Sequence, residues 1–85
     1  MDKTLHSKAN QQFLKLLKSA RTEAQLRQVD VAAQLKEPQS FVSKIESGER
    51  RLDVVELHQL CKVYGITLTE FAQRYETAVT RKAKT

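Results

Sequence analysis

Helical spacing of apolar residues is the feature that most constrains the fold of this chain. Apolar side chains recur at three- and four-residue steps in one segment after another, as in Phe13, Leu17 and Ala20. Strong helix breakers are scarce, because the 85 residues include only 2 glycines and 1 proline. This pattern predicts an all-α protein.

Five helical segments are expected from the spacing. The first begins between Thr4 and Asn10 and ends near Glu23. The other four cover approximately residues 28–35, 39–47, 54–64 and 68–79.

The residues between these segments carry helix start and stop signals. Glu37 precedes Pro38 and is therefore biased toward an extended conformation, while the proline suits the first position of a new helix. The remaining signals are left-handed stops at Gly48 and Gly65 and N-caps at Asp53 and at either Thr67 or Thr69.

Size and charge limit the classes of function. A chain of 85 residues is one domain and is too small for a second core or a deep enzyme cleft. Its 15 lysines and arginines outnumber its 10 aspartates and glutamates, and the net charge of +5 favours a polyanionic partner, either nucleic acid or an anionic membrane. The chain has no apolar run of roughly 18 residues and no signal peptide, which predicts a cytoplasmic protein.

The third segment has a polar face of unusual composition. On a helical wheel at about 100° per residue, Val42 and Ile45 point to one side. The other side and the N-terminal end carry Gln39, Ser40, Ser43, Lys44 and Ser47. Amides, hydroxyls and a cation can bond to base edges and phosphates, whereas a solvated helix favours Glu and Lys pairs four residues apart. A helix-turn-helix is therefore predicted, against the alternative of a surface helix that is merely rich in Ser and Gln.

A resemblance to the Cro/C1-type (XRE-like) helix-turn-helix regulators is carried by the run LRQVDVAAQLKEPQSFVSKIESGERRLDVVELHQLCKVYGITLTEF. The match extends from about Phe13 to Tyr75. It rests on residues at family spacing: Gln28, Ala32, Leu35, Pro38, Gln39, Ser40, Val42, Ser43, Ile45, Glu46, Gly48, Glu49 and Arg50.

The resemblance implies a compact five-helix, lambda-repressor-like DNA-binding domain in which the second and third helices form the helix-turn-helix. Residues 1–12 are then an N-terminal extension that continues into the first helix. Residues 13–76 are the DNA-binding domain, and residues 77–85 are a basic C-terminal tail.

The resemblance also implies roles for individual residues. The positions that contact bases are occupied by Gln39, Ser40, Ser43 and Lys44. The positions that contact phosphates are occupied by Gln28, Ser47, Arg50 and Arg51. A glutamine such as Gln39 can pair with both N6 and N7 of an adenine, which is worth about 1–3 kcal/mol of discrimination. Phe41 flanks the core, so packing is favoured over contact with a thymine methyl group.

Arg21 and Glu46 match a pair that the family joins as a partly buried ion pair between the first and third helices. The alternative is two unrelated exposed charges. Three residues depart from the family pattern: Lys36 and Gln25 replace frequent glycines, and Arg27 replaces a frequent threonine N-cap. We therefore expect Lys36 to relax the turn and the second helix to lose a capping oxygen.

The sequence contains no recognisable enzyme site. His58 and Cys61 lie three residues apart, but two ligands without a second pair do not make a zinc site, and Cys61 shares the apolar stripe of its helix. No catalysis, no metal and no cofactor are expected.

The expected function is sequence-specific binding of a double-stranded DNA operator by a transcriptional regulator. A repressor is favoured, because a small domain can block polymerase by occupying a promoter. A homodimer is expected, since one recognition helix reads few base pairs, and Tyr75 and Val79 are candidates for its interface unless they cap their own core. The alternatives are a protein-interaction adaptor and an antitoxin component with a toxin as its partner. No membrane partner is expected.

Overall fold

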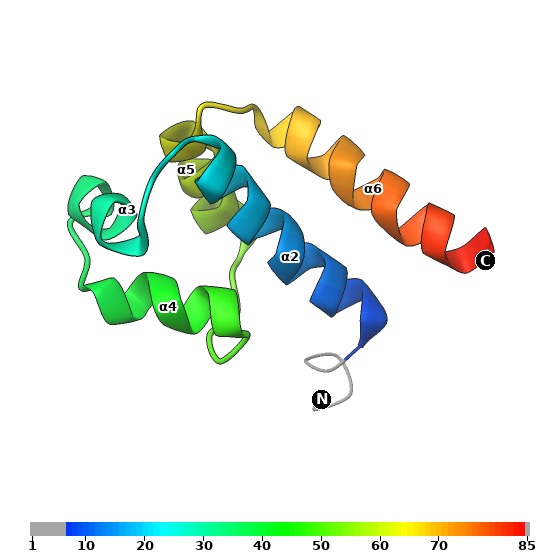
Figure 1. The fold of residues 1–85 in the computed structure, drawn as a ribbon, viewed down its shortest axis with the longest axis horizontal. Coiled ribbons are helices and arrows are strands. Elements are labelled where there is room, and N and C mark those ends of the chain that lie inside the picture. The colour runs from blue at the N-terminus through cyan, green and yellow to red at the C-terminus, as the bar shows by residue number, and fades with distance from the viewer. Residues whose placement is uncertain (1–6, 85) are drawn as a thin grey trace.

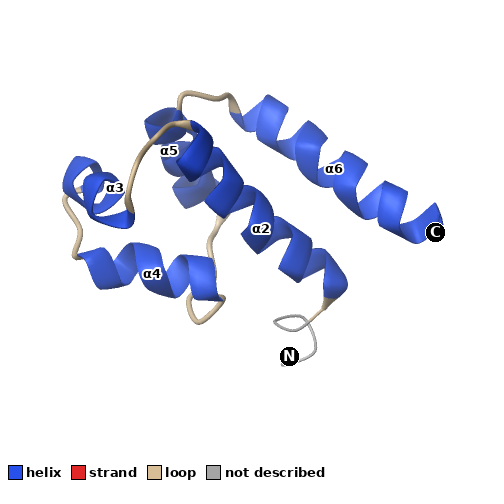
Figure 2. Ribbon diagram, viewed as in Figure 1, coloured by secondary structure: helices blue, strands red, loops and turns tan. Residues whose placement is uncertain are grey.

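A computed structural model describes residues 7–84 of the chain, and the part described is built from helices without a strand (Figures 1 and 2). The helices are α2 (Lys8–Glu23), α3 (Gln28–Leu35), α4 (Gln39–Ser47), α5 (Val54–Tyr64) and α6 (Leu68–Lys84). The predicted all-α class and the predicted segments are confirmed. No helix within residues 7–84 is both long enough and apolar enough to cross a bilayer.

The long helix α2 lies at the centre and organises the other helices around it (Figure 1). It contacts α4, α5 and α6. The short helices α3 and α4 pack tightly against each other, and α3 also contacts α5. The pair formed by α3 and α4 is therefore held against the rest of the domain by α2 and α5.

Side-chain caps mark the starts of three helices. Ser7 Oγ accepts the Asn10 backbone N–H at 3.0 Å and begins α2. At the start of α5, Asp53 accepts the backbone N–H of Glu56 at 2.8 Å, and the Glu56 carboxylate accepts that of Asp53 at 3.1 Å. This reciprocal pair is a capping box. Thr67 caps α6 by accepting the N–H of Glu70 at 2.9 Å, so it is Thr67 and not Thr69 that caps this helix.

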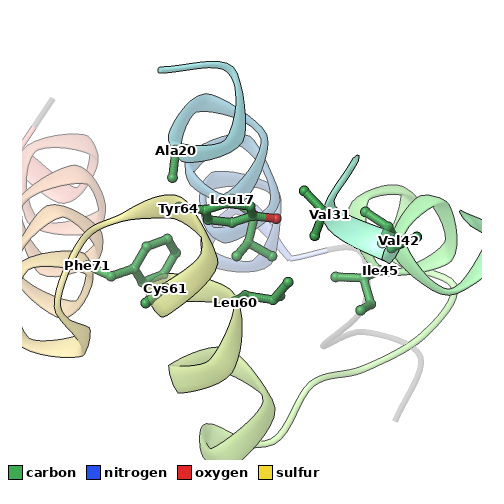
Figure 3. Packing of buried hydrophobic residues seen from close by; sticks show 10 residues of the cluster. Leu17, Ala20, Val31, Val42, Ile45, Leu60, Cys61, Tyr64 and Phe71 are labelled. Carbon is green, nitrogen blue, oxygen red and sulfur yellow. The ribbon is translucent and has the colours of Figure 1, made fainter. Parts of the chain in front are cut away.

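One hydrophobic core joins all the helices (Figure 3). Its buried residues are Leu17, Ala20, Val31, Ala32, Val42, Ile45, Leu60, Cys61, Tyr64 and Phe71. Full burial of one aliphatic or aromatic side chain stabilises a fold by about 1.5–3 kcal/mol, so these contacts dominate the stability of so small a domain. The predicted packing role of Cys61 is confirmed, since the residue is 0% exposed. Burial also raises the pKa of its thiol, which stays protonated.

Helices extend into both segments that were expected to flank the domain. Residues 8–12 already belong to α2, and residues 77–84 continue α6 as helix. Residues 1–6 and 85 lie outside the described residues. The division of the chain at residues 13 and 76 stays a prediction.

Two residues that replace family glycines keep the left-handed conformation. Gln25 has φ 62° and Lys36 has φ 59°. The turn at Lys36 is not relaxed, contrary to expectation, because backbone hydrogen bonds hold it: Lys36 N–H donates to Ala33 at 3.2 Å and Glu37 N–H donates to Ala32 at 2.9 Å. A residue with a Cβ in this conformation costs about 1–2 kcal/mol, so the hydrogen bonds of the turn outweigh a real strain.

Replacing Lys36 with glycine should relieve that strain. We expect Lys36→Gly to raise the free energy of unfolding by about 0.5–1 kcal/mol, because the relief exceeds the extra entropy that glycine gives the unfolded chain. Lys62→Gly, which also removes an exposed lysine, in the last turn of α5, is the matched control and should lose up to about 1 kcal/mol. Urea denaturation measures both, and equal losses would show that the turn carries no strain.

Candidate nucleic-acid interface

Helices α3 and α4 form the two arms of a helix-turn-helix. Three residues, 36–38, connect them, and Pro38 is the N-cap of α4 rather than its first residue. Val42 and Ile45 are each only 1% exposed, which fixes the apolar side of α4 against the core. The opposite side of α4 therefore faces away from the protein.

The predicted polar residues lie together on this outer side. Gln39, Ser40, Lys44 and Ser47 are exposed, and Ser43 is half-buried. The hydroxyl of Ser43 donates to the Ser40 carbonyl at 3.2 Å, and that of Ser47 donates to the Lys44 carbonyl at 3.1 Å. Both hydroxyl oxygens keep lone pairs that can accept a bond from a partner.

A chain of hydrogen bonds connects this face to the interior. Gln28 Nε2 donates to Glu46 Oε1 at 3.0 Å, and Gln39 Nε2 donates to Gln28 Oε1 at 3.5 Å. Gln28 and Gln39 are the first residues of α3 and α4. The hydrogen bond between their side chains therefore joins the starts of α3 and α4.

The predicted pair of Arg21 and Glu46 is in contact. Arg21 Nε donates to Glu46 Oε2 at 2.6 Å and Nη2 donates to Oε1 at 3.1 Å, and the two side chains are only 10% and 7% exposed. Arg21 Nη1 also donates to the Leu26 carbonyl at 2.9 Å, in the connection between α2 and α3. Hydrogen bonding to Glu46 raises the pKa of Arg21, so the guanidinium stays charged at any physiological pH.

Removing one partner of this pair should be costly. We expect Arg21→Met or Glu46→Met to lower the free energy of unfolding by about 3–5 kcal/mol, because each leaves a desolvated charge without its partner. The double variant should lose less than the sum of the two. Chemical denaturation of all four proteins measures the coupling, with Arg27→Met in the exposed Arg27–Asp30 pair as control. If Arg21→Met and Glu46→Met lower the free energy of unfolding as little as Arg27→Met does, the pair has no stabilising role.

The start of α3 is capped by a residue that the sequence analysis missed. Arg27 has no oxygen to cap the helix, as expected, but the Asp30 carboxylate accepts the Arg27 backbone N–H at 2.8 Å and also binds its guanidinium at 3.0 Å. The hydrogen bond from Arg27 lowers the pKa of Asp30. An acidic residue three positions after the N-cap is the sequence signal that could have identified this contact.

Arg50 and Arg51, both predicted to contact phosphates, have different surroundings. Arg50 binds Glu56, with Nη2 2.8 Å from Oε2, and its guanidinium carbon lies 4.6 Å from the centre of the Phe41 ring. Phe41 is half-buried and packs against the core, as predicted. Arg51 is exposed and forms no salt bridge with any residue in the described region. Its charge is thus available to a partner.

The remaining candidates lie away from this face. Tyr75 and Val79 on α6 are half-buried, and the Tyr75 ring meets the edge of Phe13 at a centroid distance of 6.4 Å. His58 is exposed on α5 while Cys61 is buried. Within residues 7–84, no three His, Cys, Asp or Glu side chains gather where they could hold a metal ion.

The fold and the polar outer face of α4 define the class of this molecule as a helix-turn-helix domain. A family model described as "Helix-turn-helix" matches residues 17–71. The solved structure of an XRE-family like protein from Pseudomonas syringae pv. tomato str. DC3000 superposes with a TM-score of 0.80 at 42% identity, covering 91% of this chain and 94% of that one. A comparison with curated proteins found no match. The chain belongs to the Cro/C1-type (XRE-like) helix-turn-helix family, whose domains bind DNA.

Proposed function

We propose that this protein is a sequence-specific regulator of transcription that binds double-stranded DNA with α4 in the major groove. The observation that carries the proposal is the exposed row of amide, hydroxyl and ammonium groups on α4, opposite its buried apolar side. An α-helix fits the major groove, where each base pair presents its own pattern of donors and acceptors. The net charge of +5 adds a general attraction to DNA.

Base reading is assigned to the outer residues of α4. Gln39 is the first residue of the helix, and its hydrogen bond to Gln28 limits the directions in which its amide can point. An amide held in this way loses less entropy when it pairs with an adenine. Ser40, Ser43 and Lys44 follow on the same side and complete the base-contacting set.

Phosphate binding is assigned to residues at the two ends of the helix-turn-helix. Gln28 at the start of α3 offers the second N–H of its amide, and Ser47 at the end of α4 can donate if its hydroxyl exchanges the Lys44 carbonyl for a phosphate. Arg51 offers a charge that forms no salt bridge with another described residue. Contacts of this kind set the register of a protein on DNA without reading its sequence. Arg50 was also predicted to contact phosphate, but its guanidinium is engaged by Glu56.

A repressor that acts in the cytoplasm is the favoured form of this function. A single small domain that occupies a promoter excludes polymerase without needing a second surface. A protein-interaction adaptor would not need the polar side of α4 exposed, so the exposure of Gln39, Ser40 and Lys44 argues against that alternative. An antitoxin that binds both an operator and a toxin is compatible with the same face.

Base and phosphate contacts should differ in their response to salt. Once selection from random duplexes has identified a preferred site, Gln39→Ala should weaken binding to that site about 5- to 150-fold while leaving non-specific binding nearly unchanged. Arg51→Ala should weaken both and reduce the salt slope by about one unit. Fluorescence titrations at several salt concentrations measure these effects. Equal losses on both DNAs for Gln39→Ala would refute its assignment to base reading.

A homodimer on a two-fold symmetric operator is the proposed active form. Pairing places two copies of α4 about 34 Å apart, one turn of B-DNA, so that both enter the major groove on one face. Tyr75 and Val79 remain the candidates for the interface. Both side chains are partly exposed, and Tyr75 lines an open groove of about 370 Å³ together with Phe13 and Ala72, which supports this choice.

Val79 gives the cleaner test of the interface, because Tyr75 also packs on Phe13. We expect Val79→Glu to remain folded, to sediment as a monomer and to bind the operator more weakly, since a charge would be buried between two copies. The neighbouring exposed Thr80→Glu is the matched control and should remain dimeric. An unfolded Val79→Glu protein, or an unchanged dimer, would count against this interface.

A further inference from the structure

The side chain of Arg50 connects two helices. On one side it lies over the Phe41 ring of α4 at 4.6 Å, an arrangement that favours a cation. On the other side its two terminal nitrogens reach the two oxygens of Glu56 in α5, at 3.2 and 2.8 Å. Arg50 therefore links Phe41, the third residue of α4, to Glu56, the third residue of α5.

The backbone around Arg50 is held by the same groups. Its Nη1 donates to the Arg51 carbonyl at 2.9 Å, and its own N–H donates to the Lys44 carbonyl at 3.1 Å. Glu56 accepts the Asp53 N–H at 3.1 Å. Most hydrogen bonds of the segment 48–53 thus involve Arg50 or its partner Glu56. The others are made at Gly48, at Glu49 and at the Asp53 carbonyl, and Leu52 packs against the core.

The charge of Arg50 is already compensated. A guanidinium bound bidentately to a carboxylate presents little net charge to a phosphate. The hydrogen bonds between the two groups raise the pKa of Arg50 and lower the pKa of Glu56, so both remain ionised near neutral pH. Arg51 is next in the chain, is exposed, and has no such partner among the described residues.

We propose that Arg50 is a positioning residue, which fixes the connection between α4 and α5 through Phe41 and Glu56 so that Arg51 and Ser47 meet the DNA backbone. Arg50 then contributes to DNA binding by fixing the conformation of this connection and not by contacting a phosphate itself. The inference rests on the proposed DNA-binding function.

The two roles of Arg50 predict opposite effects for a change at Glu56. If Arg50 positions the connection, Glu56→Gln should weaken DNA binding although it removes a negative charge, because the bidentate ion pair is lost. If Arg50 binds phosphate, the same change frees its guanidinium and should strengthen binding. Gln at this position still caps α5, so the helix start is preserved.

The experiment compares Glu56→Gln, Arg50→Lys and the control Glu49→Gln on one preferred duplex. We expect Glu56→Gln and Arg50→Lys to bind about three- to fivefold more weakly, as for loss of one partly exposed ion pair, since Lys keeps the charge but cannot make the bidentate bond. Glu49→Gln removes an exposed charge from the same connection and should bind slightly more tightly. Near wild-type binding by Arg50→Lys, together with tighter binding by Glu56→Gln, would overturn the proposal.

A second measurement does not depend on DNA. Hydrogen exchange of the Arg50 and Asp53 amides should accelerate about three- to fivefold in Glu56→Gln and Arg50→Lys, because the connection is less firmly held, and should stay unchanged in Glu49→Gln. Unchanged exchange in all three would refute the positioning role even if the proteins bind DNA. Faster exchange in a protein that binds no duplex would instead refute the proposed function and leave the role of Arg50 in the fold intact.

Discussion

The buried ion pair between Arg21 and Glu46 is the interaction on which the helix-turn-helix depends. It joins α2 to α4 and, through the Leu26 carbonyl, fixes the connection that leads into α3. Glu46 then binds Gln28, which contacts Gln39. A charge pair inside the domain is thereby connected, through Gln28, to the first polar side chain of α4. Two buried charges are tolerated here because no buried side-chain nitrogen or oxygen in the described region lacks a hydrogen-bond partner.

Most arginines of this protein form salt bridges within the domain and are therefore less available to attract a partner. Arg21, Arg27, Arg50 and Arg74 each form a salt bridge with a carboxylate. Within the described region only Arg51 and Arg81 form none. The excess positive charge available to DNA therefore comes mainly from lysines, Arg51 and Arg81, and simple counting of basic residues overstates what the surface offers.

Sequence patterns were sufficient to predict the helices, their stop signals and the polar side of α4, because these features depend on residues within a few positions of one another. Contacts between distant segments were harder to foresee. The Arg21–Glu46 pair was expected only through the family resemblance, since spacing carries no information across 25 residues. For Arg50, predicted to contact phosphate, no local pattern reveals that Glu56 and Phe41 both contact its side chain. Lys36 was expected to relax its turn, but the backbone hydrogen bonds to Ala32 and Ala33 proved stronger than the preference of its side chain.

The turn at Lys36 shows that the angle between α3 and α4 is set by main-chain hydrogen bonds and not by the identity of the residue at its apex. The side chain there is exposed and takes no part in the turn itself. Position 36 can therefore change its charge while the two helices keep their relative orientation. A substitution at position 36 can thus alter the electrostatic attraction of the protein to a polyanion without altering the orientation of the two helices.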